Sequence, residues 1–159
     1  MGTEIERKFL VANDSWRRES VSSVFLCQGY VKLENAQHRT FRIRIAGEKA
    51  YLTLKGPVRN LSRMEFEYAI PPEDARILIR EFCEGPLIEK TRHIVPCADG
   101  KKWEIDEFTG DNEGLVLAEI ELPEENAEFA HPGWLGQEVS GDPAYYNSNL
   151  RKNPYKNWK

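Results

Sequence analysis

The stretch Glu4-Ile5-Glu6-Arg7-Lys8-Phe9 has the alternation of a β-strand with one charged face. Successive side chains of a strand point to opposite faces, so Glu4, Glu6 and Lys8 share one face. The other face carries two apolar side chains and one arginine. This strand therefore predicts a sheet with one charged and one apolar face.

The same period-two alternation recurs along the chain. It predicts eight strands, at residues 3–10, 26–33, 39–46, 50–55, 62–70, 89–95, 102–108 and 115–122. Glycines predict hairpin turns at Gly47-Glu48 and at Asp99-Gly100. On most of these strands the charged residues fall on one face and the apolar residues on the other.

Three helices are expected among the strands. One begins at Pro71-Pro72 and is ended by Gly85-Pro86. A second is expected at residues 124–131. A third is expected from Asp142-Pro143, with Asp142 as its N-cap, to the residue before Pro154.

Two arrangements of the strands are compatible with this pattern. In a flat antiparallel sheet the charged face would be solvated, which is common. In a closed barrel, for which eight strands are about the right number, the charged faces would point inward. Arg and Glu recur on these faces, and the planar guanidinium suits phosphate or carboxylate oxygens. Charges enclosed in a barrel must pair with one another or hold a charged ligand.

Composition excludes several classes of protein. The 159 residues are enough for one domain with a core and short for two, so a single domain over residues 1–159 is expected. Lys plus Arg total 22 and Asp plus Glu 26, a net charge of −4 that argues against a nucleic-acid partner. No apolar run is long enough to span a membrane, and three cysteines suggest neither a disulfide framework nor a zinc motif. A cytoplasmic protein without a membrane partner is expected.

The charged motifs resemble those of a known family. Glu4-Ile5-Glu6-Arg7-Lys8 resembles the N-terminal signature of the CYTH superfamily, the triphosphate tunnel metalloenzymes, and of its short bacterial inorganic triphosphatases in particular. The resemblance continues in order over nearly the whole chain, through Gln28-Gly29-Tyr30, Phe41-Arg42-Ile43-Arg44, Thr53-Leu54-Lys55-Gly56, Arg63-Met64-Glu65-Phe66-Glu67, Glu89-Lys90-Thr91-Arg92, Trp103-Glu104-Ile105-Asp106, Ala118-Glu119-Ile120-Glu121 and Tyr146-Asn147. It implies an α+β fold dominated by β structure. Eight antiparallel strands would close into a barrel around a charged tunnel, with helices outside.

The resemblance also implies a divalent metal, Mg²⁺ or Mn²⁺. Carboxylate oxygens are hard ligands that suit both ions. The expected ligands are Glu4 and Glu6 on the first strand and Glu119 and Glu121 on the last, with Asp106 as a further ligand or a partner of the ligands. The first and last strands become neighbours if the barrel closes.

A small-molecule triphosphate is the expected substrate. Its charge calls for a set of cations, and the residues expected to bind it are Lys8, Arg42, Arg44, Lys55, Arg63, Lys90 and Arg92, with Lys32 extending this basic lining. Bidentate arginine contacts would fix the chain so that its terminal phosphorus faces the attacking water.

Tyr30 and Lys8 are the expected catalytic residues. A tyrosine after Gln-Gly is a candidate proton acceptor in the family, although an unperturbed phenol has a pKa of about 10. A basic environment would lower that pKa, and a metal would equally ionise water without help from Tyr30. Both routes stay open.

The expected function is metal-dependent hydrolysis of inorganic triphosphate to pyrophosphate and phosphate. The alternatives are a thiamine triphosphatase, a class IV-like adenylyl cyclase, and a non-catalytic module that binds polyphosphate or a nucleotide. One sequence does not assign the residues that would recognise an organic group. It also leaves a homodimer open.

Overall fold

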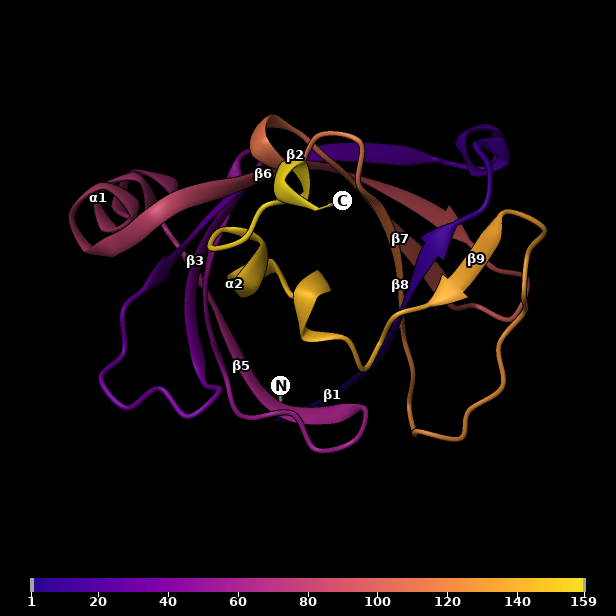
Figure 1. The fold of residues 1–159 in the computed structure, drawn as a ribbon, viewed down its shortest axis with the longest axis horizontal. Helices are drawn as coiled ribbons and strands as arrows, with labels where there is room; N and C mark the ends of the chain where they lie inside the picture. The colour runs from indigo at the N-terminus through magenta and orange to yellow at the C-terminus, as the bar shows by residue number, and fades with distance from the viewer. Residues whose placement is uncertain (1, 159) are drawn as a thin grey trace.

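Eight antiparallel strands close into a barrel in a computed structural model that describes residues 2–158 (Figure 1). The strands are β1 (Gly2–Val11), β2 (Ser22–Val31), β3 (Thr40–Ala46), β4 (Lys49–Lys55), β5 (Ser62–Ile70), β6 (Cys83–Pro96), β7 (Lys102–Phe108) and β8 (Val116–Glu121). Around the barrel they follow the order β5-β4-β3-β2-β6-β7-β8-β1, and β1 pairs with β5 to close the ring. The closed barrel is therefore confirmed, and both predicted hairpin turns join adjacent strands.

Strand β1 pairs with three different strands. Its first residues, Gly2 to Ile5, pair with β5, and residues 6–10 pair with β8. At its far end, Phe9 and Val11 pair with an additional short strand, β9 (Leu135–Glu138). Strand β1 pairs with β8 along one edge and with β5 and β9 along the other. Its pairing with β5 joins the two ends of the sheet and closes the barrel.

One helix braces the outside of the barrel. Helix α1 (Pro72–Phe82) begins where it is predicted and packs on the outer face of β3, β2 and β4. It ends earlier than predicted, because Cys83 is already extended and begins β6. Gly85-Pro86 therefore does not end the helix. These residues lie within β6, where the register against β2 shifts, and Gly85 has a φ of 73°.

The helix predicted at residues 124–131 is wrong. The segment forms a turn followed by irregular backbone, and Phe129 packs against the barrel. The Phe129 ring meets Phe9 at 5.9 Å and Trp103 at 5.7 Å between centroids, and it stacks on His131. Packing of these aromatic rings has overridden local helix propensity.

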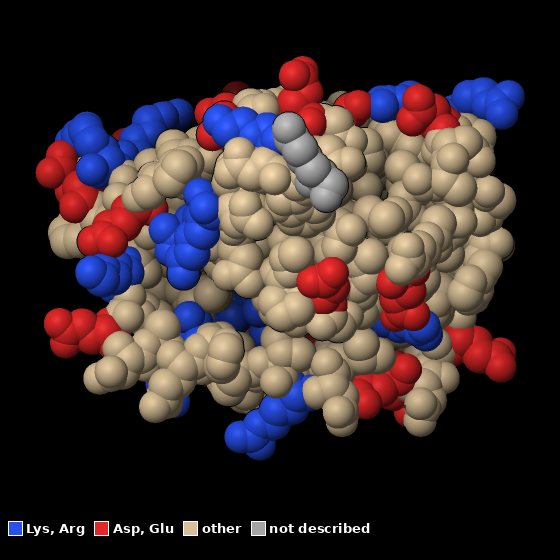
Figure 2. All heavy atoms as spheres, viewed as in Figure 1, with Lys and Arg blue, Asp and Glu red and all other residues tan. Residues whose placement is uncertain are grey.

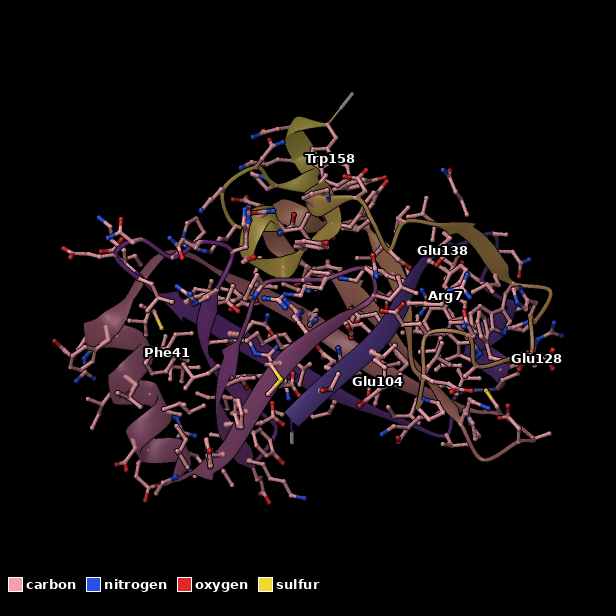
Figure 3. All side chains as sticks on the ribbon, turned by 90° about the horizontal axis from the view of Figure 1, so that it is seen from below. Arg7, Phe41, Glu104, Glu128, Glu138 and Trp158 are labelled. Carbon is pink, nitrogen blue, oxygen red and sulfur yellow. The ribbon has the colours of Figure 1, made fainter. Side chains whose placement is uncertain are left out.

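The third predicted helix is broken into short pieces. The chain forms a 3-10 turn, η3 (Pro143–Tyr145), one turn of α-helix, α2 (Asn147–Leu150), and a second 3-10 turn, η4 (Tyr155–Asn157). Asp142 does cap η3, since its side chain accepts a hydrogen bond from the Ala144 amide. This C-terminal segment lies across one mouth of the barrel (Figures 1 and 3). The remaining 3-10 turns are η1 (Ser15–Arg18) and η2 (Gly110–Asn112).

The apolar core lies mainly outside the barrel. One cluster packs Trp16, Trp103 and Trp134 between the outer face of the strands and the segments that cover it. A second holds Ile43 and Ala50 under Ala75 of α1. A third cluster covers the end of the barrel beneath the C-terminal segment, and its buried members are Ile88, Phe108, Leu115, Leu117, Val139 and Leu150. This arrangement leaves the interior to polar side chains.

Among the residues that the structure describes, no helix has the length and apolar character needed to span a membrane.

Substitution of Gly29 by alanine tests the close packing of β2 against β6. A Cβ at this position would lie 2.9 Å from both Cβ and Sγ of Cys83, so Gly29→Ala forces β2 and β6 apart. Overpacking of this kind costs about 1–3 kcal/mol. We expect urea denaturation to show that loss, whereas Gly133→Ala, with no atom near its Cβ, should stay close to wild type. Equal stability of the two variants would contradict the contact.

Candidate active site

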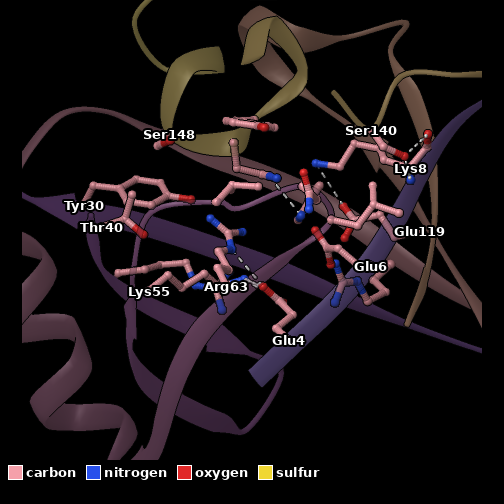
Figure 4. A pocket seen from close by; sticks show the side chains of 18 residues that line it. Glu4, Glu6, Lys8, Tyr30, Thr40, Lys55, Arg63, Glu119, Ser140 and Ser148 are labelled. Carbon is pink, nitrogen blue, oxygen red and sulfur yellow. Dashed lines mark hydrogen bonds and ion pairs between the residues drawn. The ribbon is translucent and has the colours of Figure 1, made fainter. Parts of the chain in front are cut away.

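The charged interior of the barrel contains three adjoining chambers. The central chamber (Figure 4) is lined by the predicted residues Glu4, Glu6, Lys8, Tyr30, Arg42, Lys55, Arg63, Lys90, Arg92 and Glu119. The acidic chamber shares part of this lining and adds Arg44, Glu65, Glu67, Glu104 and Glu121. The vestibule, at the other end, shares with the central chamber Tyr30, Thr40, Val58, Arg63, Tyr146 and Ser148. Of the predicted site residues, Asp106 and Lys32 line neither the central nor the acidic chamber, and Lys32 lines the vestibule.

Strand register places acids beside bases. Glu4 on β1 lies opposite Arg63 on β5, and its carboxylate receives hydrogen bonds from Arg63 Nε at 2.9 Å and from Lys55 Nζ at 2.9 and 3.1 Å. Burial alone would raise the pKa of Glu4, but Lys55 and Arg63 outweigh burial and lower it to about 2. Glu4 is therefore fully ionised.

Glu6 lacks a comparable partner. It lies between Glu4 and Glu119, and enclosure together with these two carboxylates raises its pKa to about 8. Burial also disfavours the charge of Glu119, yet Lys8, Arg92 and Lys90 keep the pKa of that carboxyl well below 4.5. The Lys8 Nζ lies 3.6 Å from the Glu119 carboxylate. At neutral pH, Glu6 thus keeps its proton and donates it in a hydrogen bond to the ionised Glu119.

Asp106 holds two of the predicted substrate-binding cations. Its side chain is fully buried, with Lys90 Nζ at 2.5 Å and Arg92 Nε at 2.7 Å from its oxygens. Arg92 also contacts Glu104, and Lys90 donates to the Asn147 side chain at 3.0 Å. Burial and then Arg92 lower the pKa of Lys90 to about 8, although Asp106 opposes the shift. The geometry makes Asp106 a partner of cations.

Arg42 and Arg44 use only some of their N–H donors in hydrogen bonds within residues 2–158. Each reaches the Glu67 carboxylate at 3.3 Å, and Thr53 donates to the same oxygen at 2.8 Å. Within residues 2–158, the Nε atoms of both arginines are buried and have no hydrogen-bond partner. Burial, Arg42 and Arg92 lower the pKa of Arg44 to about 10. Leaving buried donors unsatisfied costs free energy, and an anion bound beside these two guanidinium groups would satisfy the donors and offset the repulsion between the cations.

Tyr30 stands between the central chamber and the vestibule and lines both. Its ring is buried, and the Gln28 side-chain amide donates to its hydroxyl at 3.0 Å. The Arg151 guanidinium lies 5.4 Å from its ring centroid.

Sequence reasoning did not assign to the site the residues of the C-terminal segment. Ser140, Tyr146, Asn147 and Ser148 line the central chamber from above, and the Lys8 Nζ donates to the Tyr145 carbonyl at 3.3 Å. These residues follow no periodic pattern, so parity says nothing about their direction. The sequence signal that could have assigned them to the site was Tyr146-Asn147, which belongs to the family motifs. Lys32 lines the vestibule and not the central chamber.

The donor set fits a divalent cation. Within the described chain, no group of three or more His, Cys, Asp or Glu side chains is arranged as it stands to hold a metal ion, because the chamber carboxylates contact lysines and arginines. Glu6 and Glu121 are cross-strand neighbours, and the pKa of Glu121 is raised by burial, Glu4, Glu65 and Glu104. The glutamates of the acidic chamber crowd hard oxygen atoms together, with too few lysines and arginines to balance their charge. A hard divalent cation such as Mg²⁺ would neutralise them.

The comparisons with known proteins agree on one family. A CYTH domain model matches residues 2–147. An inorganic triphosphatase of Acetivibrio thermocellus is 49% identical over 159 residues, 100% of this chain and 99% of the relative. An inorganic triphosphatase of Nitrosomonas europaea is 37% identical over 150 residues, 93% of this chain and 96% of the relative. The solved structure of the inorganic triphosphatase NE1496 has a TM-score of 0.65 at 35% identity, covering 95% of both chains.

The Glu6–Glu119 contact predicts how stability depends on pH without metal. Glu6 keeps its proton up to about pH 8 in the folded protein but releases it near 4.5 when unfolded. Between these values the folded state binds more protons, so its free energy of unfolding falls as pH rises. Glu6→Gln should remove most of this fall between pH 5 and 8, measured by thermal unfolding in EDTA. A fall of wild-type size in Glu6→Gln would show that Glu6 is not its source.

Proposed function

Because this chain belongs to the CYTH domain family, we propose that its tunnel is the active site of an inorganic triphosphatase, and we assign the residues that act there. The protein is a metal-dependent hydrolase of phosphoanhydride bonds, and inorganic triphosphate is its substrate. Water adds to a terminal phosphorus, the bond to the bridging oxygen breaks, and pyrophosphate and phosphate leave. The observation that supports the tunnel as the site is the pair of buried, unpaired Nε donors of Arg42 and Arg44.

The basic side chains of the central and acidic chambers bind the triphosphate. Lys8, Lys55, Lys90 and the arginines of β3, β5 and β6 come from five strands, so together they surround a linear anion. Each charge-assisted hydrogen bond to a phosphate oxygen replaces part of a contact to a tunnel carboxylate. Held from several sides, the terminal phosphorus keeps one orientation toward the attacking water, which is the main requirement of phosphoryl transfer.

Glu4, Glu6, Glu119 and Glu121 would hold the metal, which we propose to be Mg²⁺ or Mn²⁺. When bound, such an ion withdraws charge from phosphate oxygens and acidifies water. The substrate frees Glu4 for this role by drawing Lys55 and Arg63 onto its own oxygens. Asp106 keeps Lys90 and Arg92 in place and is a positioning residue.

Tyr30 is the proposed proton acceptor for the attacking water, a role that it fills in its ionised, phenolate form. The Gln28 amide fixes its hydroxyl in the wall of the central chamber, close to the cations that bind substrate. Lys8 keeps Glu119 ionised and offers its remaining donors to the phosphates. We also propose a reducing, cytoplasmic location, because Cys27, Cys83 and Cys97 are free thiols. A homodimer stays a prediction.

Phosphate release from purified protein tests the function. Inorganic triphosphate, thiamine triphosphate, ATP and pyrophosphate would each be supplied with Mg²⁺ or Mn²⁺. We expect the highest kcat/KM with inorganic triphosphate, no release after EDTA treatment, and loss of turnover in Glu121→Gln with unchanged thermal stability. Tight triphosphate binding without release would indicate a binding module. A higher kcat/KM for an organic triphosphate would change the assigned substrate.

Arg44 tests the substrate-binding set. Its guanidinium lies in the acidic chamber with an unpaired Nε, so Arg44→Ala should weaken triphosphate binding and raise KM. A hydrogen bond to a charged group is worth about 1.5–3 kcal/mol, which corresponds to a loss of roughly 10- to 150-fold in kcat/KM. Arg76→Ala, on the exposed surface of α1, is the matched control. An Arg44→Ala enzyme with wild-type KM would remove this residue from the substrate-binding set.

A further inference from the structure

The vestibule is the largest of the three chambers and the most basic. It encloses about 690 Å³ between the C-terminal segment, the loop at residues 32–39 and the turn after β4. Its cationic lining is Lys32, Arg39, Arg63, Arg151 and Lys152, joined by His38, and it includes no Asp or Glu. Figure 2, in the same view as Figure 1, shows basic side chains around and within a recess beside the C-terminal segment.

Charge changes sign along the tunnel. The vestibule lining is basic only, and the central chamber combines a majority of bases with Glu4, Glu6 and Glu119. In the acidic chamber, glutamates outnumber lysines and arginines. The two mouths therefore differ. A phosphate anion is attracted at the vestibule and repelled at the far end by the excess of carboxylates.

The cations at the rim of the vestibule are available to a ligand. Lys32, Arg39 and Lys152 are exposed, and within residues 2–158 none of them forms an ion pair with an acid. The exposed, charged rim contrasts with the central chamber, where most cations are already paired. It has the composition expected of a surface that attracts an anion without holding it tightly.

The loop that presents two of these cations has an unusual backbone. Asn35, Gln37 and His38 have φ values of 51°, 48° and 65°, a region that non-glycine residues seldom adopt. The turns that result carry the chain out of β2 and back into β3 around the mouth, with Lys32 at the start of the loop and Arg39 at its end. Backbone strain of this kind is kept where surrounding structure requires it.

We propose that the vestibule is the port through which the triphosphate anion enters the tunnel, and that Lys32, Arg39 and Lys152 steer it there. This inference rests on the proposed function and adds a direction to it. Substrate passes from a purely basic region to Tyr30 and Arg63, which the vestibule shares with the central chamber, and then reaches the buried cations. Steering by clustered charge raises association rates by about 10- to 1,000-fold and weakens as salt screens it.

The test removes the rim charges and leaves the buried site intact. In Lys32→Gln/Arg39→Gln/Lys152→Gln, kcat/KM for inorganic triphosphate should fall at least about tenfold at low ionic strength, with kcat within about twofold of wild type. The decline of kcat/KM with rising salt should also become shallower. The control is Lys49→Gln/Arg76→Gln/Arg80→Gln, which removes the same charge from exposed positions that line none of the three chambers.

The outcomes separate the two proposals. A loss confined to the rim variant supports the port. Wild-type kcat/KM and salt dependence in the rim variant, or an equal loss in the control, would overturn the port while the triphosphatase stands. A rim variant with lowered kcat and unchanged KM would also overturn it, because those residues would then act in the chemical step. An inactive wild-type enzyme would instead refute the proposed function.

Discussion

Charges of both signs enclosed by a barrel must neutralise one another or a ligand, and the rest of this molecule follows from that constraint. Asp106 shows it most fully, since its buried carboxylate is shared by Lys90 and Arg92. The pairing is incomplete, however. Glu6 holds a proton next to Glu119, and buried guanidinium nitrogens of Arg42 and Arg44 have no partner within residues 2–158. An excess of acid and an excess of base therefore coexist a few residues apart, which suits a metal and a polyphosphate bound together.

The strands and the direction of their side chains could be predicted from sequence because period-two alternation is a local property. Parity predicted that Glu4 and Glu6 lie on the charged face of the first strand and Glu119 on that of the last, and the barrel places all three in one chamber. Closure itself was not decided by alternation, since a flat sheet has the same pattern. The family resemblance decided it, and the pairing of β1 with β5 confirms it.

The sequence-based predictions that were wrong share a physical cause, which is packing between segments far apart in the chain. The predicted helix at residues 124–131 does not form, and Phe129 packs against the Phe9 and Trp103 rings instead. Gly85-Pro86 is part of a strand because β6 continues along β2. The site residues that escaped prediction, such as Ser148, reach the tunnel through short turns without periodicity. Asp106 was predicted as a metal ligand or as a partner of the ligands. The structure shows that its carboxylate oxygens accept hydrogen bonds from Lys90 and Arg92.

The triple pairing of β1 has a consequence for how the protein is made. Strand β1 precedes all three of its partners in the chain, so its pairing is complete only when β5, β8 and β9 have been synthesised, the last of them ending at Glu138. At about 5–20 residues per second, this strand waits on the order of ten seconds with unpaired edges. The side chains of β1 that line the central chamber are thus exposed to wrong partners for longer than those of the strands that follow. Charged side chains protect such edges against aggregation, and β1 carries them at alternate positions, at Glu4, Glu6 and Lys8.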